Sequence, residues 1–228
     1  MEEKYQKIKE IVEKESLGAD PVHDASHVTR VYNLCLKLAE KEKGIDLDVI
    51  KLAALLHDIG GVREQEDKSG KTNHAKESAK MAFDILSRFN FPKEKIGQVI
   101  HCILAHRYRG SSLKPNTKEA KILFDADKLD ALGAIGIARA YAWTGKNNGK
   151  LSGDISLKEY IKDNVVGNKI NGRIKDKTKH SPFVEYELKL KHLPKKLDTK
   201  RAKLMANQRL VRMKQFFDIL KREIKGER

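Results

Sequence analysis

Apolar residues recur every three or four positions through most of the first 145 residues, which is the spacing of helices that bury one face. This pattern predicts a series of helices joined by short connections. The predicted helices cover about residues 2–16, 26–43, 46–59, 74–90, 93–106 and 117–144. We expect Asp24 to cap the second helix, the Gly60-Gly61 pair to end the third, and the polar stretch 62–73 to form a loop.

The pattern changes after residue 145. Residues 145–182 are rich in Gly, Asn, Lys and Ser, and they predict a polar excursion with one short helix near 157–163. Residues 183–191 fit a strand by alternation and a helix by their three- and four-residue spacing, and Pro194 is expected to end the segment in either case. A basic amphipathic helix is predicted over about 198–224.

These elements predict an all-α fold, a single-domain helical bundle with a polar insertion before the C-terminal helices. We expect a helical core over residues 1–145 that carries any active site. A loop-rich insertion should follow over 146–182, and a basic helical segment over 183–228 should pack on the core.

Composition excludes several classes of protein. The chain is 39% hydrophobic and 35% charged, and it has no apolar run long enough to span a bilayer. Its start has neither an apolar region nor a cleavage site of the secretory kind. The two cysteines, Cys35 and Cys102, lie among apolar residues of predicted helices, so we expect reduced core thiols in a cytoplasmic protein.

The net charge of +15 is unevenly distributed. Residues 1–140 hold 24 Lys and Arg against 22 Asp and Glu, whereas residues 141–228 hold 23 against 10. A cationic surface attracts anions, so the C-terminal excess indicates a phosphate-bearing partner, either a small molecule or a nucleic acid.

The candidate chemistry lies in the near-neutral part of the chain. His57 and Asp58 end an apolar helix, and His27 and Asp127 fall on the inward sides of two others. A buried carboxylate is costly unless it is paired or bound to a metal, and two histidines with two aspartates suit a divalent ion. The alternative interpretations are a hydrogen-bonded core histidine at His27 and a solvated helix face at Asp127.

Five stretches of the sequence resemble the HD-domain superfamily of metal-dependent phosphohydrolases, in particular the small stand-alone group that includes nucleotide pyrophosphatases. The stretches are HDASHVTRV at 23–31, LAALLHDIGG at 52–61, HAKESAKMAFDIL at 74–86, ILAHRYRG at 103–110 and AKILFDADKLDALGAIGIARA at 120–140. The resemblance covers almost the whole chain, and it specifies the superfamily but not the substrate.

The resemblance implies that four residues hold the metal, namely His27, His57, Asp58 and Asp127. Asp127 is preferred to Asp125 and Asp130, which fit supporting or surface roles, because it precedes a basic residue. That residue, Lys128, is the implied phosphate contact. Further candidates for binding the substrate are Arg107 and Arg109.

His74 and His106 have two possible roles under the resemblance. In two-metal branches of the superfamily, two further histidines bind a second ion, whereas in one-metal members histidines of this region act as acid, base or phosphate donor. We expect one divalent ion with a second as the alternative, and the sequence does not distinguish Mn, Mg, Fe, Co or Zn. The implied reaction is hydrolysis of a nucleotide phosphoanhydride or phosphoester by metal-activated water.

Two other functions remain open at this point. One is a di-iron oxygenase, since a branch of the superfamily uses two irons in that way. The other is a basic nucleic-acid-binding protein with a structural metal site, which the shortage of aromatic residues in the C-terminal segment disfavours. We therefore expect a small phosphorylated substrate, no membrane partner, and a C-terminal segment that provides a cationic approach for it. The sequence does not indicate an oligomeric state.

Overall fold

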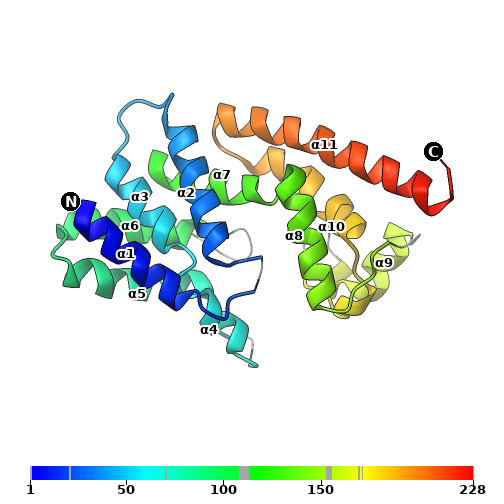
Figure 1. The fold of residues 1–228 in the computed structure, drawn as a ribbon, viewed down its shortest axis with the longest axis horizontal. Helices are drawn as coiled ribbons and strands as arrows, with labels where there is room; N and C mark the ends of the chain where they lie inside the picture. The colour runs from blue at the N-terminus through cyan, green and yellow to red at the C-terminus, as the bar shows by residue number, and fades with distance from the viewer. Residues whose placement is uncertain are drawn as a thin grey trace. The chain divides into compact units, whose positions relative to one another are not determined.

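The fold is all-α, as predicted, and Figure 1 shows it in a computed structural model. The structure describes residues 2–20, 22–69, 71–107, 113–152, 156–168, 170 and 172–227. These residues include no β-strand, only an isolated bridge between Val165 and Ile174. The chain divides into two compact units, Met1–Asp127 and Lys128–Arg228.

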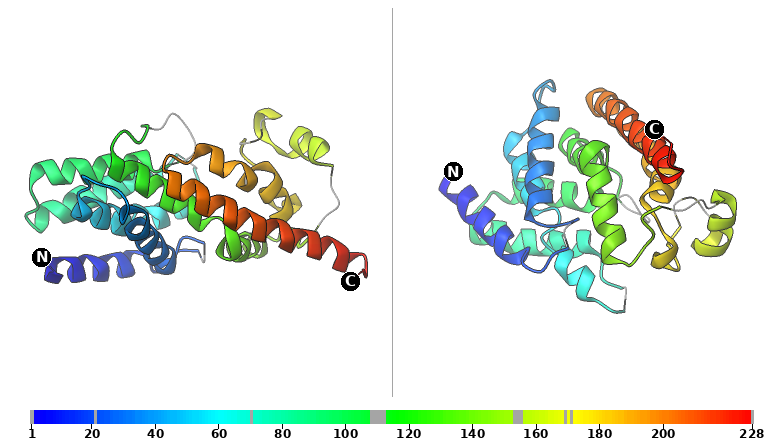
Figure 2. Two further views of the ribbon diagram at one scale, coloured as in Figure 1. Left: turned by 90° about the horizontal axis from the view of Figure 1, so that it is seen from above. Right: turned by 45° about the vertical axis from the view of Figure 1, so that its right-hand side comes forward.

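The first unit is arranged around α3 (Leu47–Leu56), a short and largely apolar helix. Its helices are α1 (Glu2–Glu15), α2 (Ala25–Ala39), α3 (Leu47–Leu56), α4 (Gly61–Glu66), α5 (His74–Arg88), α6 (Lys93–Ala105) and the greater part of α7 (Lys118–Asp130). Helix α3 contacts α1, α2, α5 and α6, and α5 packs along α6 (Figure 2). In α3, the residues from Val49 to Leu56 are buried except Lys51, which explains why this stretch of sequence lacks a polar face.

Capping side chains determine where the helices of the site begin. Asp24 caps α2, as predicted, and its carboxylate accepts a hydrogen bond of 3.0 Å from the His27 backbone N–H. Asp46 caps α3, and Asn73 caps α5 immediately before His74. The predicted extension of α2 to residue 43 was wrong, because the chain leaves the helix after Ala39 and reaches a left-handed Gly44 with φ of +67°.

The predicted loop over 62–73 was wrong in its first part, because Gly61–Glu66 forms the short helix α4. No residue of α4 is buried, so its sequence, GVREQE, has no apolar periodicity to detect. The helix contacts α5, and Arg63 on it pairs with Glu77 at 3.5 Å.

The long helix predicted over 117–144 is interrupted. It divides into α7 and α8 (Gly133–Lys146), with Leu132 extended between them and Gly133 at φ of +75°. A β-carbon at Gly136 would lie 2.2 Å from the Ala131 carbonyl oxygen, so the interruption also requires glycine there. The break directly follows the Asp127-Lys128 pair in sequence.

The second unit consists of α8, α9 (Leu157–Asn164), α10 (Pro182–Leu188), a 3-10 helix (Leu190–Lys196), α11 (Lys200–Ile224) and two short 3-10 turns. The short helix near 157–163 is confirmed as α9, and the ambiguous segment 183–191 begins as a helix. Pro194 does not end it, because the fixed φ of proline fits the 3-10 helix that continues to Lys196. The cluster of Tyr160, Val165, Val184 and Leu188 forms a core within this unit.

Both cysteines are buried and unpaired, as expected. Among the described residues, no helix has the length and hydropathy needed to cross a bilayer.

Gly60 provides a test of the packing that positions the site. A β-carbon there would lie 2.7 Å from both the Glu77 β-carbon and the Ser78 backbone nitrogen, whereas one at Gly61 would meet nothing within 4 Å. We expect Gly60→Ala to lower the free energy of unfolding by about 1–3 kcal/mol through overpacking. The matched change Gly61→Ala should alter it by no more than about 0.5 kcal/mol. Urea unfolding of both variants measures the difference, and equal effects would contradict it.

Candidate metal centre

Six ionisable side chains from five helices of the first unit converge on one place. His27 comes from α2, Asp127 from α7 and His74 from the first position of α5. Three more residues follow helix ends directly, namely His57 and Asp58 after α3 and His106 after α6. The structure therefore brings together the four residues predicted as metal ligands and both additional histidines.

The first group consists of His27, His57 and Asp127, whose ligand atoms all lie within 4.8 Å of one another. The His27 and His57 Nε2 atoms are 3.4 Å apart, and His27 Nε2 lies 3.6 Å from Asp127 Oδ1. Asp58 Oδ2 adjoins this group, 3.4 Å from His27 Nε2 and 3.6 Å from His57 Nε2. Two imidazole nitrogens and two carboxylate oxygens thus face one another around buried histidines, a donor set suited to a divalent ion.

The second group consists of Asp58, His74 and His106, again with ligand atoms within 4.8 Å of one another. Asp58 Oδ1 lies 3.4 Å from His106 Nε2 and 3.8 Å from His74 Nε2, and the two Nε2 atoms are 3.3 Å apart. Asp58 therefore faces the two groups with different carboxylate oxygens.

The environment of Asp58 fits a metal ligand. Its Oδ1 atom is buried and has no hydrogen-bond partner among the described residues. Leaving such an atom unpaired is costly, and a bound cation would remove the cost. The residues present therefore fit the divalent ion that the sequence predicts.

Two of the histidines are oriented by backbone carbonyls of their own helices. His57 Nδ1 donates to the Ala54 oxygen at 2.9 Å, and His106 Nδ1 donates to the Ile103 oxygen at 2.5 Å. The last carbonyls of a helix lack intrahelical partners, so they are available to accept these bonds. A proton on Nδ1 leaves the Nε2 lone pair directed at the site, which is the state that a metal requires.

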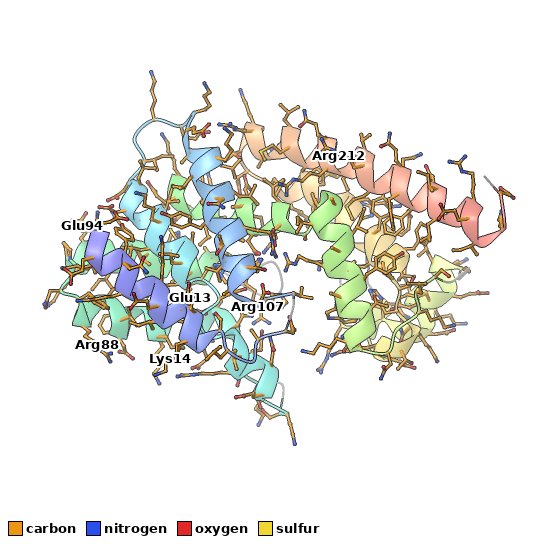
Figure 3. The ribbon with its side chains drawn as sticks, viewed as in Figure 1. Glu13, Lys14, Arg88, Glu94, Arg107 and Arg212 are labelled. Atoms are coloured by element: carbon orange, nitrogen blue, oxygen red, sulfur yellow. The ribbon has the colours of Figure 1, made fainter. Side chains whose placement is uncertain are left out.

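His74 is oriented differently. Its Nδ1 lies 2.5 Å from Glu64 Oε2 on α4, and Glu64 Oε1 accepts a hydrogen bond of 3.1 Å from the Arg107 guanidinium. Arg107 is labelled in Figure 3. Sequence reasoning missed Glu64, because nothing in the polar stretch that follows Gly61 distinguishes it from Glu66 or Asp67.

Burial and mutual attraction set the protonation states before any ion is bound. Burial lowers the pKa of His57 to about 4, against the opposing attraction of Asp58. Burial alone would raise the pKa of Asp58, but the surrounding histidines hold it well below its usual range. Near neutral pH, His57 is therefore neutral and Asp58 ionised, as ligands must be.

The pKa values of Glu64 and His74 shift in opposite directions. Burial opposes the shift of each, but their hydrogen bond raises the pKa of His74 and lowers that of Glu64. The carboxylate of Glu64 is accordingly ionised when it accepts the proton of His74.

The remaining predicted residues differ in their placement. Lys128 occupies the next position of α7 after Asp127, and Arg107 is paired with Glu64. Arg109 lies outside the described residues. Asp125 and Asp130 are both buried, so neither is a surface carboxylate, and Asp130 accepts a 2.7 Å hydrogen bond from Arg139.

Comparison with known proteins identifies one matching family model, together with proteins that are similar to this chain in sequence and in structure. The HD domain family model matches residues 24–132, which include every residue of both groups. The chain is 32% identical over 222 residues to the uncharacterized protein YpgQ of Bacillus subtilis (strain 168), covering 96% of this chain and 91% of YpgQ.

Two solved structures are similar over nearly their whole length. The crystal structure of Bacillus subtilis YpgQ in complex with ADP is 27% identical with a TM-score of 0.70, over 97% of this chain and 98% of that one. An HD-superfamily hydrolase from Bacillus thuringiensis is 26% identical with a TM-score of 0.70, over 99% of both chains.

Proposed function

The chain belongs to the HD-domain family, whose members include hydrolases, and from this premise we propose that it is a divalent-metal-dependent phosphohydrolase acting on a nucleotide. The observation that carries the proposal is Asp58, whose two carboxylate oxygens face two separate groups of side chains that include histidines, and whose buried Oδ1 has no hydrogen-bond partner among the residues described. Such an arrangement is suited to binding cations next to a phosphate.

The nucleotide part of the proposal is supported by a relative. YpgQ of Bacillus subtilis, which matches nearly the whole chain, has been crystallised with ADP. The charge of the chain agrees with an anionic substrate, since residues 141–228 hold 23 Lys and Arg against 10 Asp and Glu. We propose a phosphoanhydride or phosphoester of a nucleotide as the bond that is hydrolysed.

We propose that the first group, with Asp58 Oδ2, holds one ion and that the second group holds another. The geometry supports the ligand role for His74 and His106, because both Nε2 atoms face the same Asp58 oxygen. A bound divalent ion lowers the pKa of a water molecule and polarises a phosphoryl oxygen.

The chain's own residues then bind and orient the substrate. Lys128, the residue after Asp127 on α7, is proposed to neutralise phosphate charge. The carbonyls of Ala54 and Ile103 keep the Nε2 atoms of His57 and His106 unprotonated and fixed in direction. Little covalent chemistry is required of the protein in phosphoryl transfer, so positioning and charge neutralisation are the main contributions of these residues.

The proposal is tested with a panel of substrates and metals. Ribonucleoside and deoxyribonucleoside tri-, di- and monophosphates and bis-p-nitrophenyl phosphate are each assayed with Mn²⁺, Mg²⁺, Co²⁺ and Fe²⁺, and the products are resolved as phosphate or pyrophosphate by ion chromatography. We expect metal-dependent turnover of at least one class of nucleotide.

Other outcomes would contradict the proposal. Absence of turnover across the whole panel, together with salt-sensitive binding of RNA or DNA by the metal-stripped protein, would favour the nucleic-acid-binding alternative. Two iron ions per chain in protein prepared without oxygen, with turnover that requires O₂, would favour the di-iron oxygenase.

A further inference from the structure

His74 differs from the other oriented histidines because it begins a helix. His57 and His106 follow the ends of α3 and α6, where the carbonyl three residues earlier accepts the Nδ1 proton. His74 is the first residue of α5, and Asn73 before it is the helix cap. No turn of helix precedes His74, so a carbonyl of its own helix is not available to orient its ring.

Glu64 takes the place of that carbonyl. Its Oε2 atom lies 2.5 Å from His74 Nδ1, which fixes the proton on that nitrogen and leaves Nε2 facing Asp58 Oδ1 and His106 Nε2. The contact crosses from α4 to α5, so the direction of the His74 ring depends on a side chain from another helix.

Arg107 in turn holds Glu64. Its Nη2 atom donates to Glu64 Oε1 at 3.1 Å, while Oε2 of the same carboxylate is on His74. With its two oxygens on different partners, the carboxylate is restrained in both rotation and position. The guanidinium predicted to contact phosphate is therefore bound to a carboxylate beside the second group.

We propose that Glu64 is a positioning residue for the second ion, acting through His74 and held in place by Arg107; this rests on the proposed function, in which His74 is a ligand. The ion at His27, His57 and Asp127 does not depend on Glu64, because among the described residues the hydrogen bonds and ion pairs of Glu64 are to His74 and Arg107. Loss of Glu64 therefore weakens one of the two ions selectively. Outer partners of metal-bound histidines typically change metal affinity by about 10- to 100-fold.

The experiment measures metal binding rather than activity. Protein stripped of metal is titrated with Mn²⁺, and the ions per chain and their dissociation constants are obtained by equilibrium dialysis with elemental analysis. Glu64→Ala should retain the tight ion and weaken the second by about 10- to 100-fold. Glu64→Gln, whose amide oxygen can still accept the His74 proton, should fall between the wild type and Glu64→Ala.

Glu77 offers a matched control. It pairs with Arg63 at 3.5 Å between the same two helices, α4 and α5, and in the described part of the chain it has no hydrogen bond or ion pair with a histidine. Glu77→Gln should bind both ions as the wild type does. In a His74→Ala background, Glu64→Ala should produce no further loss, because a residue that acts through His74 has nothing left to position.

The outcomes separate this inference from the proposed function. Two ions of unchanged affinity in folded Glu64→Ala would overturn the role of Glu64 while leaving the phosphohydrolase proposal intact. A wild-type protein that binds only one ion would overturn the role of Glu64 and the second ion together. Unfolding of Glu64→Ala, seen by circular dichroism, would leave Glu64→Gln to decide. Wild-type affinity for both ions in Glu64→Gln, or a loss that Glu77→Gln shows equally, would then overturn the inference.

Discussion

Asp58→Ala should abolish metal binding at both groups and lower phosphohydrolase activity by more than about 100-fold, since even an outer-shell partner of a metal ligand typically contributes about 10- to 100-fold. Asp58 adjoins both groups, with Oδ2 near the Nε2 atoms of His27 and His57 and Oδ1 near those of His74 and His106. Replacing Asp58 with alanine therefore removes one donor oxygen from each of the two groups. Elemental analysis of the purified variant measures the loss of metal, and the nucleotide assay measures the loss of turnover.

The fold should survive this change, because Asp58 contributes no apolar surface and its Oδ1 has no hydrogen bond to lose within the described part of the chain. Far-ultraviolet circular dichroism should therefore match the wild type. Asp84→Ala, at an exposed position of α5, is the control for removal of an aspartate and should leave metal content and activity unchanged. Phosphohydrolase activity that persisted in Asp58→Ala without bound metal would contradict the proposed site.

The parts of the site that could be predicted from sequence are those encoded locally. His57 and Asp58 stand out because an ionisable pair closes the apolar run of α3, where burial would otherwise penalise it. Asp24 is recognisable as a cap by its type and place, and the cap fixes the first turn of α2 that carries His27. Helical spacing then indicates that His27 and Asp127 face inward, and the resemblance assigns their roles.

The parts that could not be predicted depend on contacts between segments distant in sequence. Glu64 lies on α4, a helix without an apolar face. Its role depends on its hydrogen bonds with His74 and Arg107, which only the folded structure brings together. The interruption at Gly133 separates α7 from α8 within a stretch whose apolar spacing is continuous, and the positive φ of Gly133 that marks it leaves no trace in that spacing. The local sequence pattern thus indicated which residues are candidate metal ligands. Tertiary packing determined which of their atoms lie close together.

Removal of the metal should abolish activity and lower the melting temperature of the wild-type protein. Without an ion, the carboxylate of Asp58, the carboxylate of Asp127 and the Nε2 lone pair of a neutral His57 lie close together at the first group, and this cost is borne only by the folded state. An ion that binds the folded chain stabilises it by about 2.7 kcal/mol at a concentration of 100 times its dissociation constant. For a chain of this size, that corresponds to a shift of roughly 5–10 °C.

Differential scanning calorimetry of chelator-treated protein with and without added Mn²⁺ measures this shift, and restored turnover on adding Mn²⁺ shows that the loss is reversible. Asp58→Ala should melt at the same temperature with and without Mn²⁺, because it lacks the donor common to both groups. A wild-type melting temperature indifferent to Mn²⁺, with full activity in chelator, would place the chemistry of this chain outside the convergent histidines and aspartates. The coupled loss of stability and turnover would instead tie both to the same ions, since a cation that only screened surface charge would raise the melting temperature of Asp58→Ala as well.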